Sequence, residues 1–84
     1  MRTMKVRLLF FAVLRDIAGT GARELALADG ATARDVWQWM RESYAPLADY
    51  AQPPLIAVNE AYAAPETVLR DGDEVAFIPP VAGG

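Results

Sequence analysis

The sequence contains no cysteine and no histidine, and two other reactive residue types occur only once each. Ser43 is the only serine and Lys5 is the only lysine. A Ser-His-Asp triad, a cysteine nucleophile and a metal site built from histidine or cysteine are therefore excluded. We also expect no bound metal and no stably bound cofactor. Without cysteine there are no disulfides, so packing must stabilise the fold, which is compatible with a reducing cytoplasm.

The length and the net charge of the chain further limit the class of protein to which it can belong. With 84 residues, of which 54% are hydrophobic and 23% charged, the chain is expected to fold as one domain. The net charge of −3 and the scattered arginines argue against a nucleic-acid partner. The apolar run at residues 8–14 is too short to span a bilayer and has no signal-peptide cleavage site. We therefore expect no membrane partner and a cytoplasmic location.

Residues 5–14 alternate in a way that predicts a first strand. One face carries no charge and is the expected core face: Val6, Leu8, Phe10, Ala12 and Leu14. The other face mixes Lys5 and Arg7 with Leu9, Phe11 and Val13. Residues 16–21 contain two glycines and predict a turn, so residues 22–28 are expected to form a hairpin with the first strand.

Thr32 and Asp35 have the spacing of a helix N-terminus, in which each side chain bonds the backbone of the other. The following residues place one apolar stripe on a helix, and Pro46 is expected to end that helix. The members of the stripe are Ala33, Val36, Trp37, Met40 and Tyr44.

Three further segments are expected to be extended: residues 55–58, 61–63 and 74–78. In the last of these, Val75 and Phe77 are expected to face inward and Ile78 outward. The order strand, strand, helix, strand, strand predicts an α+β fold with the helix over one face of the sheet.

The last six residues, Pro79-Pro80-Val81-Ala82-Gly83-Gly84, form a distinctive segment. The two prolines favour a stiff, extended backbone, and the glycines have no side chains to obstruct entry into a narrow channel. A carboxylate on Gly84 would first need activation, for which we expect an ATP-dependent adenylating enzyme. The alternative is a frayed terminus without a function.

Three stretches resemble the family of small subunits of molybdopterin synthase, which are ubiquitin-like sulfur carriers. They are Leu9-Phe10-Phe11-Ala12-Val13-Leu14-Arg15-Asp16, Leu55-Ile56-Ala57-Val58-Asn59, and residues 69–84, which read LRDGDEVAFIPPVAGG. The resemblance implies a β-grasp fold with a mixed sheet over residues 1–78 and one main helix on one of its faces. It also implies an extended Gly-Gly tail over residues 79–84.

The same resemblance implies the chemistry and the partners. An E1-like enzyme would use ATP to adenylate Gly84, and the product would be converted to a thiocarboxylate. The tail would then enter the large synthase subunit and donate sulfur to a cyclic pterin precursor, within a heterotetramer of two small and two large subunits. The small subunit would not be an enzyme on its own.

Neighbouring first and last strands, as in a β-grasp sheet, would bring Phe11 and Ile78 into one apolar patch for docking a partner. Pro79, Pro80, Val81 and Ala82 would contact the partner as part of the tail, and Arg15 could hydrogen-bond the tail or the partner. Two alternatives stay open. The chain could be a sibling carrier for thiazole or cysteine synthesis, tRNA thiolation or protein conjugation, or an interaction module with an inert tail.

Overall fold

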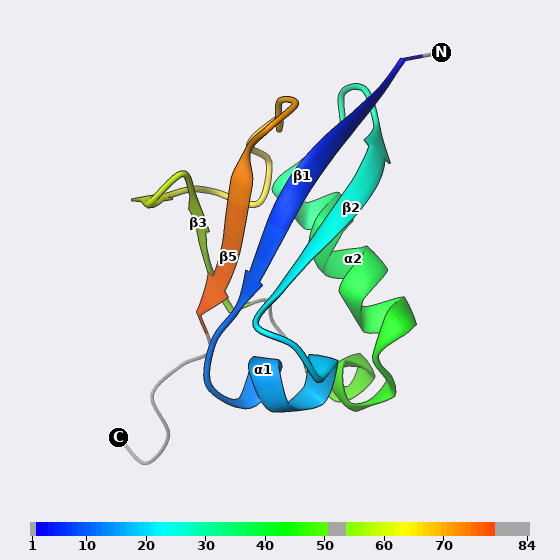
Figure 1. Cartoon of the computed structure of the whole chain (residues 1–84), viewed down its shortest axis with the longest axis vertical. Helices are drawn as coiled ribbons and strands as arrows, with labels where there is room; N and C mark the ends of the chain where they lie inside the picture. The colour runs from blue at the N-terminus through cyan, green and yellow to red at the C-terminus, as the bar shows by residue number, and fades with distance from the viewer. Residues whose placement is uncertain (1, 51–53, 79–84) are drawn as a thin grey trace.

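The computed structural model describes residues 2–50 and 54–78 (Figure 1). The predicted Gly-Gly tail at residues 79–84 lies outside these residues. Along the chain the elements are β1 (Thr3–Phe10), α1 (Val13–Ala18), β2 (Ala22–Ala28), α2 (Ala33–Ser43), a 3₁₀ helix (Ala45–Asp49), β3 (Leu55–Val58), β4 (Ala61–Tyr62) and β5 (Glu74–Ile78).

The strands form one mixed sheet in the order β2-β1-β5-β3-β4. β1 runs parallel to β5, whereas the β1–β2, β3–β4 and β3–β5 pairs are antiparallel. The first and last strands are therefore neighbours, as predicted. Helix α2 covers one face of this sheet (Figure 1).

The core lies between α2 and the sheet face that it covers. The apolar stripe of α2 is buried as predicted at Ala33, Val36, Trp37 and Met40, and Tyr44, which follows the helix, packs partly buried against the core. The matching sheet residues are Val6, Leu8, Phe10, Val75 and Phe77, each no more than 2% exposed. Within the described residues, no helix lies on the opposite face of the sheet, which we call the uncovered face.

The predicted start of α2 is confirmed. Asp35 N donates to Thr32 Oγ1 at 3.3 Å, and Thr32 N donates to Asp35 Oδ2 at 2.9 Å. These two bonds satisfy backbone donors that have no partner inside the helix. The helix ends at Ser43, and Pro46 lies in the first turn of the 3₁₀ helix that follows.

The predicted extent of the first strand was wrong. β1 ends at Phe10, and Val13–Ala18 forms helix α1 where strand and turn were expected. The chain leaves the sheet at Ala12, whose φ of 52° is incompatible with a strand and whose side chain is exposed rather than in the core. Leu14 is 1% exposed, but it reaches the core from α1. A buried Leu14 is compatible with a strand and with a short helix, so the alternation of apolar residues wrongly extended the predicted strand to Leu14.

The antiparallel pairing of β1 with β2 was predicted, but α1 joins the two strands instead of a tight turn. Gly19 closes α1 with a φ of 76°, and its N–H donates to the carbonyl of Arg15 at 2.9 Å. A left-handed residue at this position favours glycine, because glycine has no Cβ to collide with the backbone.

Candidate functional site

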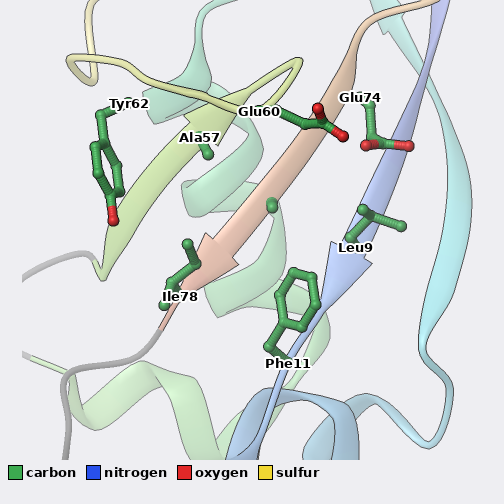
Figure 2. Close-up of a pocket in the computed structure, with 8 residues that line it drawn as sticks. Leu9, Phe11, Ala57, Glu60, Tyr62, Glu74 and Ile78 are labelled. Carbon is green, nitrogen blue, oxygen red and sulfur yellow. The ribbon is translucent and has the colours of Figure 1, made fainter.

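The uncovered face of the sheet carries a pocket whose floor is set by strand register. Leu9 of β1 lies beside Ala76 of β5, Ala76 beside Ala57 of β3, and Ala57 beside Tyr62 of β4. The two central residues are small and the two outer ones are large. This row across four strands therefore forms a hollow of about 350 Å³ (Figure 2).

Phe11 and Ile78 line the same pocket, as the strand alternation predicted. Phe11 follows β1 and is 46% exposed, whereas Ile78 is the last residue of β5 and is half-buried. Leu55 lies beside Ile78 in the neighbouring strand and is 58% exposed. Buried apolar surface drives protein association, so an exposed apolar patch of this kind suits a partner surface. The structure shows where these side chains lie, and their role in binding stays a prediction.

Two carboxylates close the other end of the pocket. Figure 2 shows Glu60, from the turn between β3 and β4, and Glu74, at the start of β5, near each other above the strands. The sequence reasoning missed Glu60, Tyr62 and Ala57 as site residues. The two-residue turn Asn59-Glu60 was the available signal, because it returns β4 alongside β3.

Arg15 does not join this pocket. It belongs to α1 and lines a separate, polar hollow together with Asp16, Gly19, Thr20 and Gly21. Six of the predicted site residues lie outside the described residues: Pro79, Pro80, Val81, Ala82, Gly83 and Gly84. A contact between Arg15 and the tail therefore stays a prediction.

Two properties of the described ranges 2–50 and 54–78 bear on other functions. They contain no group of three or more acidic side chains placed to hold a metal ion. None of their helices is long and apolar enough to cross a membrane.

Comparison with known proteins identifies relatives over nearly the whole chain. The model of the ThiS family matches residues 8–84. The molybdopterin synthase sulfur carrier subunit of Escherichia coli (strain K12) is 42% identical over 81 residues, covering 94% of this chain and 99% of that protein. The protein of the same name from Mycobacterium tuberculosis is 39% identical over 82 residues, covering 96% and 99%.

Solved structures agree on the fold. A putative molybdopterin converting factor subunit 1 from Pyrococcus furiosus superposes with a TM-score of 0.83 at 30% identity, covering 93% of this chain and 99% of that one. The predicted ubiquitin-like β-grasp fold is thereby confirmed. The chain therefore belongs to the ThiS family, within the group of molybdopterin synthase sulfur carrier subunits.

Proposed function

We propose that this chain carries sulfur on Gly84 for molybdopterin synthase and delivers it while docked, through its uncovered sheet face, on the large subunit. One structural observation carries the docking step. The exposed Phe11 and the strand end at Ile78 line the apolar end of one pocket, and the Gly-Gly tail begins at the next residue, Pro79. A partner bound on this face would receive the tail directly beside it.

The chemistry begins with the Gly84 carboxylate, which is a poor electrophile. A carboxylate oxygen attacks the α-phosphate of ATP on an E1-like adenylating enzyme, and pyrophosphate leaves. Sulfur at the sulfide level, as HS−, then attacks the acyl carbon and AMP leaves, which gives a thiocarboxylate on Gly84 with no change of oxidation state. This chain supplies the acyl group, and the activating enzyme supplies the ATP site.

Delivery depends on the length and shape of the tail. Residues 79–84 span at most about 20 Å when fully extended, so the acceptor must lie within that distance of Ile78. Pro79 and Pro80 keep the first part extended, Val81 and Ala82 contact the channel wall, and Gly83 and Gly84 pass its narrowest part.

The acceptor in this proposal is a cyclic pterin phosphate precursor bound to the large subunit, which receives the sulfur for the dithiolene that later holds molybdenum. Two small and two large subunits form the assembly, in the cytoplasm. Arg15 contributes a hydrogen bond to the tail or to a partner. The large subunit contributes the pterin site and its catalytic residues.

Intact-protein mass spectrometry tests the carrier step. The purified chain is incubated with the activating enzyme of its own organism, ATP and a sulfur source. We expect a mass increase that matches replacement of one oxygen by one sulfur, located in the Gly84 peptide and dependent on ATP. If the mass does not increase, although the same enzyme preparation modifies another carrier, there are two explanations. Either this enzyme does not activate this chain, or the tail is inert.

Repeating the incubation in cell extract separates those two cases. If the mass still does not increase, the result would favour an interaction module with an inert tail. Co-purification then separates the sibling pathways. A carrier for this pathway brings down the large subunit of molybdopterin synthase, whereas a carrier for thiazole synthesis brings down a thiazole synthase.

A further inference from the structure

The pocket on the uncovered sheet face has two chemically different ends. Its apolar end is formed by Phe11 and Ile78, and its acidic end by Glu60 and Glu74 (Figure 2). Among the described residues that line the pocket, none has a basic side chain. A purely apolar partner segment would therefore leave one end of the pocket poorly matched.

Asn59 links the two backbone segments that carry the carboxylates. Asn59 N donates to the carbonyl of Glu74 at 2.8 Å, and Glu74 N donates to Asn59 Oδ1 at 3.0 Å. Asn59 Nδ2 also donates to Asp73 Oδ1 at 2.9 Å. The turn that bears Glu60 is thus hydrogen-bonded to the strand that bears Glu74, which holds the backbone positions of the two glutamates next to each other.

Glu60 occupies a position that normally favours glycine. Asn59 and Glu60 both have positive φ, 52° and 71°, in a two-residue hairpin turn. Asparagine suits the first position of such a turn and glycine the second. A glutamate with φ in this region carries a strain of about 1 kcal/mol or more, which is commonly retained where the side chain has a role.

The acidic residues in this region differ in whether their carboxylates accept hydrogen bonds from the chain itself. Asp73 Oδ2 accepts from Arg70 N at 2.8 Å, and Asp71 Oδ1 accepts from Lys5 N at 2.8 Å. Within residues 2–50 and 54–78, neither Glu60 nor Glu74 has a side-chain hydrogen bond or an ion pair. Met1 and residues 51–53 and 79–84 include no lysine or arginine that could pair with them.

One cation of the chain does lie close by in the sheet. Arg7 of β1 is the register neighbour of Glu74, and it lines a different hollow together with Glu24. Its guanidinium forms no ion pair with Glu74 in the described part of the chain. Glu60 has no such neighbour in the register, so a cation from outside the chain meets two carboxylates.

We propose that the pocket recognises a protein partner that presents an apolar side chain beside an arginine or lysine. The apolar side chain rests on Ala57 and Ala76, and the cation pairs with Glu60 and Glu74. This inference rests on the proposed function, because the partner meant is the large subunit that receives the tail. Beyond the proposed function, it specifies that the docking segment of the large subunit is positively charged and that its cation points toward Glu60 and Glu74.

The test measures the Kd of this chain for the large subunit of its own organism at two salt concentrations. The double variant Glu60→Gln/Glu74→Gln is expected to bind about tenfold more weakly than the native chain at about 0.05 M salt. The difference should disappear at about 1 M salt, where the screening length is only about 3 Å.

The matched control is Glu42→Gln/Asp49→Asn, which changes the net charge equally at two exposed sites on the helical side of the domain, outside the pocket. It should bind within about twofold of the native chain, because distant surface charges contribute little to a docked complex. Equal weakening in both variants would mean that net charge alone matters, and this would overturn the proposal.

The proposal also fails if the pocket variant binds as the native chain does at both salt concentrations, and in that case the proposed function stands. If the native chain does not bind the large subunit at all, the proposed function itself fails and the charge inference falls with it. Thermal unfolding of each variant separates loss of binding from loss of fold.

Discussion

The rings of Trp37 and Phe77 lie 5.7 Å apart between centroids, with their planes 38° from each other. Trp37 belongs to α2 and Phe77 to β5, so this contact joins the helix to the strand that leads into the tail. Both residues are almost completely buried, at 3% and 0% exposed. The packing of α2 therefore holds β5, and with it the point where the tail begins.

Replacing Phe77 by alanine should remove this contact and leave a cavity. We expect the free energy of unfolding to fall by about 3–5 kcal/mol, a large part of the about 5–15 kcal/mol that a small domain has. Urea unfolding followed by Trp fluorescence measures the change. Leu55→Ala is the control, because Leu55 is 58% exposed and its loss should change stability by no more than about 0.5 kcal/mol.

Asn59→Ala should destabilise the domain through two separate losses. The variant lacks the side-chain bonds to Asp73 and Glu74, and alanine tolerates the φ of 52° less well than asparagine does. We expect a loss of about 1–3 kcal/mol in unfolding free energy. Asn59→Gly loses the bonds and keeps the favourable φ, so it should lose less. A larger loss for glycine than for alanine would contradict this account.

Phe11→Ala should weaken binding to the large subunit while leaving the fold intact. Phe11 is 46% exposed, so its removal costs the domain little, whereas a buried aromatic anchor in an interface is worth about 2 kcal/mol or more. We expect the Kd to rise about 30-fold or more by titration calorimetry. Val68→Ala, at 59% exposed and outside the pocket, serves as the control and should bind normally.

Deleting Gly83 and Gly84, or adding one residue after Gly84, should abolish ATP-dependent sulfur loading and transfer. The first change removes the acyl group that is activated, and the second moves the carboxylate one residue further along the chain. Neither change touches the described core, so the thermal unfolding midpoint should stay the same. Sulfur transfer by either variant at the native rate would rule out Gly84 as the carrier.

The sequence alone determined the elements whose signals are local. Thr32 and Asp35 marked the start of α2, and the extended segments expected at 55–58 and 74–78 are β3 and β5. The outward phase of Phe11 and Ile78 was also correct. These signals work because capping and alternation are properties of neighbouring residues. The family resemblance of residues 69–84 implied the carrier chemistry of the tail.

Only the tertiary structure decided where β1 ends and what completes the pocket. Leu14 suits a strand and a helix equally, and Ala12 gives no sequence signal for its positive φ. The pocket needs the register of four strands, which sets two alanines between Leu9 and Tyr62. Its acidic end needs Glu60 and Glu74, which are fourteen positions apart and are brought together by the pairing of β3 with β5. Such contacts depend on long-range strand pairing, which short-range patterns do not encode.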